Sequence, residues 1–487
     1  MDPGRACPGL ISEQHQRTDM KRENKKGQWG SSFGFLMATV GAAVGLGNLW
    51  GFPYKMGKGG GFIFLLIYLI LVLLVGIVMT LQELATGRKS GKGVLYAYGA
   101  VDRRASIIGL FGWLSPLFII GFYSMLGGYT IKYMIANLGD VFHAPWGVCG
   151  AESSEFFTAF YTNQYESAIY TVVFICLILF IIAMGIKNGI EKFSSVATPA
   201  LFVMLLIVIA RAVTLPGALE GVRFMLVPDW SLFTPRGIIN VLASAGGQMF
   251  FSLSLGMGIT VTYGSYVSKK DDLQQSAIFI PMADTAAALL AGFATIPAVF
   301  AEGLDPGQGP GMLFVTLQTV FKSMGAAGPV FGLIFYLLVF IAAITSAVSV
   351  MEAIVSTALD IVEARVKNAN RVAVTIGCGI FALAEGLFVS LDGLGSHGFP
   401  QLFSQTTWLD TFDLLSEGTL MPIGALLAAI LFGWIRPGYL DDEISLGSRK
   451  DNLRHYFNFC IRWIVPPIMF MVLLGQISAF FGLGWFD

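Results

Sequence analysis

The chain has 487 residues, of which 55% are hydrophobic and 13% are charged, about half the charged share of a soluble protein. Its formal net charge is -1, from 30 Lys and Arg against 31 Asp and Glu. A large soluble enzyme would need more polar surface than this composition supplies, and a nucleic-acid-binding protein would need a basic face. We therefore expect an integral membrane protein that binds no nucleic acid.

The polar N-terminal segment, residues 1–27, lacks the apolar stretch of a signal peptide. We expect it to be a cytoplasmic tail. Because Met20 precedes a basic run, residues 1–19 are expected to be either an over-called start or a disordered segment. The five cysteines of the chain lie far apart, with no spacing typical of a metal site.

Apolar stretches long enough to cross about 30 Å of hydrocarbon recur along the whole chain. They predict about eleven transmembrane helices, at residues 32–54, 62–86, 107–137, 167–186, 192–213, 238–267, 274–303, 327–364, 371–390, 406–435 and 456–480. Basic residues concentrate in alternate connecting segments, so the positive-inside rule predicts a cytoplasmic N-terminus. An odd number of spans then predicts an external C-terminus. We expect the protein in the cell membrane.

The first apolar segment is unusually rich in glycine between residues 41 and 51. Each glycine costs a helix about 1 kcal/mol relative to alanine. Close packing of helices through small residues explains Gly41 and Gly45, which are four residues apart. It does not explain Gly47 followed by Asn48. We therefore predict that this helix unwinds near mid-membrane, where freed carbonyls and the Asn48 amide can bind a cation.

The sixth apolar segment repeats this pattern, with Gly256 and Gly258 following Ser252 and Ser254. Interrupted helices in matching places of two halves indicate a transporter built from inverted repeats. The predicted domains are the N-terminal tail at 1–27, a first repeat at 28–213, an external connection at 214–237, a second repeat at 238–435, and a cytoplasmic loop with an eleventh helix at 436–487.

Short motifs spread over nearly the whole chain carry a family resemblance. They are Trp29-Gly30-Ser31, Gly45-Leu46-Gly47-Asn48-Leu49-Trp50-Gly51-Phe52-Pro53, Glu83 with Gly87-Arg88, Ser252-Leu253-Ser254-Leu255-Gly256, Thr262-Tyr263-Gly264-Ser265-Tyr266 and Thr345-Ser346. Together they resemble the neurotransmitter:sodium symporter family, the LeuT-type transporters, including bacterial members. The resemblance implies an all-α membrane protein with the LeuT fold, in which two inverted five-helix repeats contain discontinuous helices 1 and 6. It also implies Na+-driven uptake of amino acids or amines by alternating access.

The resemblance implies two sodium sites with oxygen ligands, which suit a hard cation. The first site would be formed by Ala43, Asn48, Ser252 and Asp284. The second would be formed by Gly41, Val44, Ala342, Thr345 and Ser346. A charged Asp284 would supply the negative charge that chloride supplies elsewhere in the family, which predicts chloride-independent uptake. A structural, protonated carboxyl is the alternative interpretation of this intramembrane acid.

The resemblance also implies a substrate pocket. Its positions are Ala42, Ala43, Gly45, Leu46, Gly47, Ile119, Tyr123, Phe251, Ser252, Ser254, Met257, Ser346, Ser349 and Val350. Tyr123 and the amides of Leu46 and Gly47 would bind a carboxylate, and Phe251 would cover the pocket from outside. The other end of the pocket is apolar, and a methionine there can repack around different side chains. A neutral, apolar L-amino acid, aromatic ones included, therefore fits best.

Gating residues follow from the same resemblance. The predicted cytoplasmic gate contains Trp29, Lys26, Asp360 and Tyr266, with a snorkelling interfacial cluster as the alternative. Glu83 is expected to brace the unwound part of helix 6.

At the outer gate the chain departs from the family, because Gly51 stands where an arginine is expected. The acid Asp413 and the polar Gln248 remain, and Lys55, four residues after Gly51, could reach in from one turn higher if the helix continues past Pro53. This departure leaves open a Na+-coupled transporter of another small amine or amino-acid-like solute.

Other classes of membrane protein fit the sequence less well. A channel would show repeated short pore segments or rings of like charge. An enzyme would need a catalytic arrangement of side chains, and no histidine is suitably placed. An ATP-driven pump would carry a GxxxxGK[ST] loop, which does not occur. We therefore expect no enzymatic activity, and the sequence leaves the oligomeric state open.

Overall fold

The computed structural model describes residues 28–230, 234–306, 311–366, 369–403, 405–448, 453–483 and 485, and the regular secondary structure in these ranges is helical. The helices of the first half are α2 (Ser32–Ala43), α3 (Phe52–Lys58), α4 (Phe62–Leu71), α5 (Ile77–Ser90), α6 (Val94–Val101), α7 (Ser106–Val141), α8 (Ser153–Thr162), α9 (Gln164–Ala183), α10 (Lys192–Ala212) and α11 (Ala218–Leu226). The predicted tail, with its gate residue Lys26, lies outside the described residues.

The helices of the second half are α12 (Pro235–Ser252), α13 (Ile259–Gly264), α14 (Leu273–Ala301), α15 (Leu317–Ser323), α16 (Gly328–Glu363), α17 (Arg371–Asp392), α18 (Trp408–Leu415), α19 (Met421–Ile430), α20 (Asp441–Ser445), α21 (Leu453–Trp463) and α22 (Val465–Phe481). Turns of π-helix join several of them into longer rods, for example between α4 and α5, where the turn is Val72–Gly76.

Among the described residues, eight helical segments are long and apolar enough to cross a membrane. They are Phe62–Ser90, Arg103–Val141, Gln164–Ala183, Ile186–Ala212, Leu273–Ala301, Gly325–Glu363, Arg371–Asp392 and Trp408–Ile435. Two bent pairs raise the number to ten: α2 with the segment Gly47–Lys58, and α21 with α22. The predicted sixth segment corresponds to α12 and α13, which a non-helical stretch at 253–258 separates.

The predicted eleventh segment, 456–480, is not one straight helix. It consists of α21 and α22, which meet at an angle of 46°. The helix α21 is amphipathic, with Phe457 and Ile461 buried and Phe459 and Arg462 exposed. Because the exposed face of α21 carries His455 and Arg462, α22 is the more apolar of the two parts, and the pair together is long and apolar enough to span.

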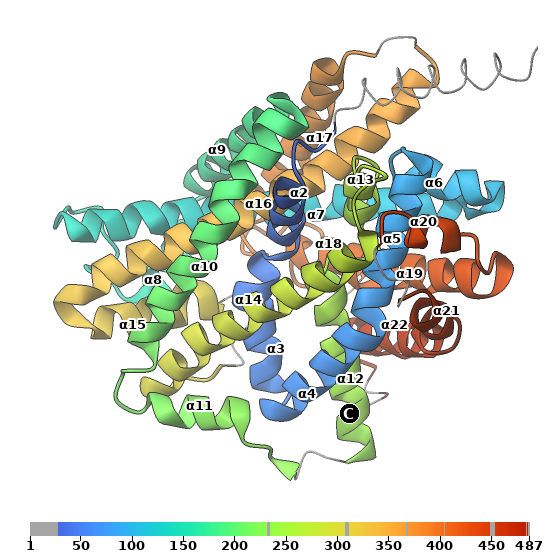
Figure 1. Ribbon diagram of the computed structural model, residues 1–487. Coiled ribbons are helices and arrows are strands. Elements are labelled where there is room, and N and C mark those ends of the chain that lie inside the picture. The colour runs from blue at the N-terminus through green and yellow to red at the C-terminus, as the bar shows by residue number, and fades with distance from the viewer. Residues whose placement is uncertain are drawn as a thin grey trace, which may run out of the picture.

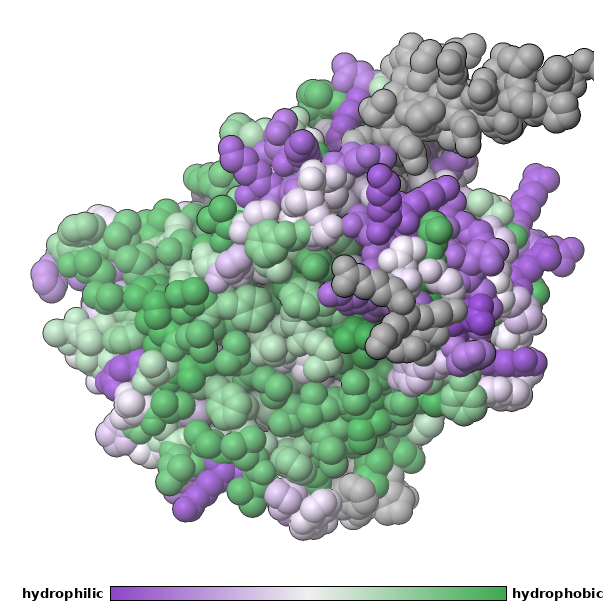
Figure 2. All heavy atoms as spheres, in the orientation of Figure 1, coloured by the Kyte–Doolittle hydropathy of each residue, from purple (hydrophilic) through white to green (hydrophobic). Residues whose placement is uncertain are grey.

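The interrupted helix, α2 with α3, lies in the interior of the bundle (Figure 1). There α2 packs against α10, α14 and α16, and α16 packs along α7. Figure 2 shows a broad hydrophobic band over the molecule, with hydrophilic residues gathered at one end. This distribution is the one expected of a protein that crosses a bilayer.

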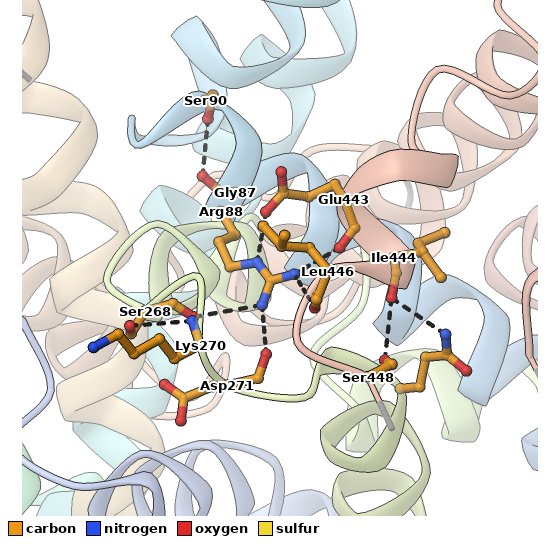
Figure 3. Close-up of polar contacts among 11 residues, drawn as sticks. Gly87, Arg88, Ser90, Ser268, Lys270, Asp271, Glu443, Ile444, Leu446 and Ser448 are labelled. Carbon is orange, nitrogen blue, oxygen red and sulfur yellow. Dashed lines mark hydrogen bonds and ion pairs between the residues drawn. The ribbon is translucent and has the colours of Figure 1, made fainter. Parts of the chain in front are cut away.

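A buried arginine holds two connecting segments together at the end of α5 (Figure 3). The Nε atom of Arg88 donates to Glu443 Oε1 of α20 at 2.6 Å, and its other nitrogens donate to the carbonyls of Asp271 at 2.7 Å and Leu446 at 3.1 Å. The Arg88 side chain is only 1% exposed. The connection between α13 and α14 is thereby fastened to α20.

Candidate functional site

The first break lies between α2 and the π-helical turn that leads into α3. Helix α2 ends at Ala43, and the continuing helix is tilted by 49°. The N–H of Gly45 donates to Asn48 Oδ1 at 3.0 Å, which satisfies one of the backbone groups that the break frees. A Cβ on Gly45 would lie 2.4 Å from Ser346 Oγ and 2.6 Å from the Tyr123 hydroxyl. Only glycine therefore fits at this point.

The second break, between α12 and α13, is built from left-handed backbone. Gly256 and Gly258 have φ values of 76° and 69°, which glycine adopts without strain. Ser254 has a φ of 54°, an uncommon conformation for a residue with a Cβ that often marks a functional site. The N–H of Gly256 donates to Glu83 Oε1 at 2.7 Å, so Glu83 occupies the position expected of a brace.

The two breaks face one cavity. It is lined by Ala42, Ala43, Gly45, Gly47, Ile119, Tyr123, Phe251, Ser252, Ser254, Met257, Ser346 and Val350. Every one of these residues belongs to the predicted substrate set. The two other members of that set, Leu46 and Ser349, are not among the lining residues.

Leu46 and Ser349 nevertheless contact the surroundings of the cavity. The N–H of Leu46 donates to the Tyr123 hydroxyl at 3.2 Å. The Ser349 hydroxyl accepts from the Tyr263 hydroxyl at 2.7 Å and donates to the carbonyl of Thr345 at 2.9 Å. Polar groups therefore gather near the helix breaks, while Ile119, Met257 and Val350 add apolar side chains to the lining.

The residues of the first predicted sodium site lie together beside this cavity. The Asn48 amide nitrogen donates to Asp284 Oδ1 at 2.7 Å and to Ser252 Oγ at 3.0 Å. Ser252 Oγ in turn donates to Asp284 Oδ2 at 2.9 Å, and all three side chains are buried. The hydroxyl of Tyr68 lies 3.5 Å from Asp284 Oδ2. We did not identify Tyr68 from the sequence, because nothing in α4 marks it except a polar group inside an apolar run.

The residues of the second predicted sodium site meet where α2 contacts α16. Ser346 Oγ is 3.2 Å from the carbonyl oxygen of Gly41 and 3.4 Å from that of Val44. Thr345 Oγ1 donates to the carbonyl of Ala342 at 3.0 Å. The atoms that could coordinate an ion here are all oxygens, the ligands preferred by hard cations.

The predicted inner-gate residues fall into two groups. Trp29 donates from Nε1 to the Tyr263 carbonyl at 3.2 Å and packs edge-on against the rings of Tyr263 and Tyr266. Asp360, in contrast, accepts from the N–H of Gly93 at 2.6 Å. Its predicted partner Lys26 lies outside the described residues.

The hydroxyl of Tyr266 donates to a buried acid that we did not identify from the sequence, Glu352 of α16, at 2.8 Å. The other carboxylate oxygen of Glu352 pairs with Arg371 at 2.5 Å. An acidic residue in the middle of a long apolar helix is a functional candidate by default, and this signal could have identified Glu352. Arg371 carried no such signal.

At the predicted outer gate, Gln248 occupies the space beside Gly51. A Cβ on Gly51 would lie 2.9 Å from Gln248 Oε1, and Gln248 Nε2 donates to the Gly47 carbonyl at 2.8 Å. Four residues after Gly51, the side chain of Lys55 forms an ion pair, with Lys55 Nζ 2.8 Å from Glu417 Oε1.

Glu417 also contacts Asp413, the acid that we expected at the outer gate. The ion pair between the first and tenth helices therefore involves Lys55 and Glu417, one helical turn away from the expected positions. Glu417 was not among our predicted residues, although its spacing of four from Asp413 puts both on one helix face.

The comparisons with known proteins agree with this geometry. The family model of the sodium:neurotransmitter symporter family matches residues 26–169 and 164–486. The chain is 33% identical over 460 residues to the sodium-dependent transporter YhdH of Bacillus subtilis, covering 94% of this chain and 99% of YhdH. A sodium-dependent transporter of Haemophilus influenzae is 31% identical over 468 residues, covering 94% of this chain and all (100%) of its own length.

A crystal structure of MhsT in complex with L-phenylalanine superposes with a TM-score of 0.82 and 32% sequence identity, covering 92% of this chain and 99% of MhsT. This similarity confirms the predicted LeuT fold. The relatives are transporters rather than enzymes. The chain therefore belongs to the sodium:neurotransmitter symporter family and is a membrane-spanning, Na+-coupled symporter.

Proposed function

We propose that this protein imports a neutral, apolar L-amino acid, aromatic ones included, together with Na+ and without a requirement for chloride. The observation that carries the proposal is the cavity at the two helix breaks. None of the described residues that line it is acidic or basic. A substrate with a charged side chain would be left without a partner there, and burying an unpaired charge is costly. The related MhsT forms a complex with L-phenylalanine, which supports the choice of substrate.

The two ends of the cavity suit the two ends of such a substrate. The Tyr123 hydroxyl and the backbone amides at Leu46 and Gly47 would donate to the carboxylate, since the N-terminus of a half-helix favours negative charge. Ile119 and Met257 would contact the apolar side chain. Phe251, which packs against Gly47, would cover the substrate from the outside.

Sodium would bind at both predicted sites. At the first, the Asn48 amide would turn its oxygen toward the cation, and Ser252 and Asp284 would supply further oxygens. A negatively charged Asp284 next to Na+ removes the need for chloride as a counter-charge. At the second site the carbonyls at the end of α2 and the hydroxyls of Thr345 and Ser346 would surround the ion.

Transport would proceed by alternating access between two gates. We place the N-terminus in the cytoplasm and the C-terminus outside, in the cell membrane, from the distribution of basic residues. Trp29, Asp360 and Tyr266 then lie on the cytoplasmic side of the cavity. Gln248 and Asp413 lie on the external side, and Glu83 supports the broken helix between them.

Uptake of radiolabelled L-phenylalanine into proteoliposomes tests this function. We expect accumulation with an inward gradient of sodium chloride or sodium gluconate at equal rates, and none with potassium salts. A requirement for external chloride would contradict the role of Asp284. Na+-driven accumulation of an amine, with no response to apolar amino acids, would instead favour the alternative substrate class.

A further inference from the structure

Near the end of α21, an exposed arginine packs beside two exposed tryptophans. The guanidinium of Arg462 is 5.5 Å from the ring centre of Trp434 and 5.3 Å from that of Trp463. The two rings meet edge-on with centres 5.1 Å apart, and they are 52% and 53% exposed. Trp434 Nε1 donates to the Arg462 carbonyl at 2.9 Å. The hydrogen bond fixes Trp434, which follows α19 in the π-helical turn Leu431–Ile435, against α21.

Among the residues that the structure describes, no carboxylate neutralises the charge of Arg462. Within the described ranges no ion pair involves Arg462, whereas Arg436, two residues after Trp434, pairs with Asp102 at 3.0 Å. Contacts with aromatic faces orient a guanidinium through its plane and leave its N–H edge available. Such an edge can donate two parallel hydrogen bonds to a phosphate. The group is therefore oriented and exposed.

The position of Arg462 relative to the bilayer follows from the bend between α21 and α22. The 17 residues of α22 are about 25 Å long, close to the roughly 30 Å of hydrocarbon. The preceding helix α21, whose C-terminal end carries Arg462, turns away from it by 46°, which puts Arg462 close to the end of the span. Tryptophan is enriched at this level of the bilayer. Phe459 and Ile435, 59% and 60% exposed, extend the apolar surface around the arginine.

We propose that Arg462, Trp434 and Trp463 form a binding site for the headgroup of an anionic phospholipid. The Arg462 edge would bind the lipid phosphate, and the two indole rings and Phe459 would contact the glycerol and the start of the acyl chains. The apolar surroundings argue for a lipid as the source of the phosphate, because a free ion would gain nothing from them. The site belongs to α21 and the turn Leu431–Ile435 that follows α19, outside the cavity between the two helix breaks.

Native mass spectrometry of the purified full-length protein, titrated with phosphatidylglycerol or phosphatidylcholine, tests the site. We expect Arg462→Gln to weaken phosphatidylglycerol binding about fivefold, the effect of one basic residue near an anionic surface. Arg462→Lys should retain part of the affinity, because it keeps the charge but not the planar edge. Trp434→Leu should also weaken binding. The matched control is Arg103→Gln, at an exposed arginine on the turn Arg103–Ala105, which should bind as the parent does.

Several results would overturn the proposal. They are equal phosphatidylglycerol binding by the parent and Arg462→Gln, an equal loss in Arg103→Gln, and equal affinity of the parent for phosphatidylcholine. Displacement of the lipid by millimolar inorganic phosphate would assign the site to a free anion instead. If the thermal unfolding midpoint shows that Arg462→Gln is misfolded, the test rests on Arg462→Lys. Phosphatidylglycerol affinity of Arg462→Lys equal to that of the parent would then refute a role for the guanidinium edge.

Discussion

The hydroxyl of Ser346 lies 2.4 Å from the point where a Cβ on Gly45 would stand. Real Cβ atoms do not approach an oxygen so closely, so the break in the first helix and the middle of α16 are in direct contact. Because Ser346 also lies within 3.4 Å of the carbonyls of Gly41 and Val44, one side chain contacts both the cavity and the second predicted sodium site. This contact offers a structural route by which substrate and cation binding can influence each other.

Gly45→Ala is expected to lower L-phenylalanine uptake by at least about fivefold, because overpacking at such a site typically costs 1–3 kcal/mol. The added methyl group would displace Ser346 or the Tyr123 hydroxyl. The measurement is initial uptake in proteoliposomes at saturating Na+. Gly377→Ala is the control, since a Cβ at Gly377 meets nothing within 4 Å. Equal uptake by both variants would contradict the close contact.

Asp284→Asn is expected to weaken apparent Na+ affinity by about tenfold or more, since hydrogen bonds to a charged group contribute about 1.5–3 kcal/mol. The change keeps the shape of the side chain that Asn48 and Ser252 contact and removes its charge. Uptake measured against Na+ concentration, in chloride and in gluconate, gives the answer. Chloride should now stimulate uptake by the variant. The exposed Asp442→Asn serves as control, and an unchanged Na+ response in Asp284→Asn would refute the assignment.

Lys55→Met is expected to speed dissociation of bound L-phenylalanine by about twofold to fivefold, since partly exposed ion pairs contribute up to about 1 kcal/mol. The side chains of Lys55 and Glu417 are 23% and 9% exposed. Loss of the lysine leaves Glu417 next to Asp413 without its cation. A chase experiment with unlabelled ligand measures the rate. L-phenylalanine should dissociate more slowly from the double variant Lys55→Met with Glu417→Gln than from Lys55→Met alone. A dissociation rate of Lys55→Met equal to that of the parent would exclude a gating role for the ion pair.

Arg88→Met is expected to destabilise the protein by roughly 3–5 kcal/mol, because removal of one partner leaves a buried, unpaired charge. The carboxylate of Glu443 would lose its cation, and the connection between α13 and α14 would detach from α20. Thermal unfolding in detergent measures the effect. Combining Arg88→Met with Glu443→Met should recover part of the loss, whereas the exposed Lys92→Gln should have little effect. A parental midpoint for Arg88→Met would contradict the buried ion pair.

Local features of the chain were enough to predict where the two helices break. Gly45, Gly256 and Gly258 stand where no side chain fits or where φ is positive, and such requirements are visible in the residue type itself. The predicted substrate residues came from the family resemblance, position by position. Their gathering around one cavity followed because the spacing between helices is shared with MhsT, which covers 92% of this chain.

The pairs that join distant helices were not predictable in the same way. Two ion pairs show this: Glu352 with Arg371, and Lys55 with Glu417. Which residues pair depends on how the two helices lie against each other. A single sequence does not reveal how far apart two helices lie in the folded protein. For the same reason the straight helix expected at 456–480 proved to be two, because its bend depends on packing and on the bilayer surface.

The sequence by itself determined that the protein spans a membrane, which helices are interrupted, and which residue types stand at the interruptions. These properties depend on hydrophobicity and on backbone conformation, which are local. Only the tertiary structure decided that Tyr68 joins Asp284, that Tyr266 bonds to Glu352, and that Lys55 pairs with Glu417. Buried polar groups must find partners at hydrogen-bonding distance, and packing determines which partner lies within reach.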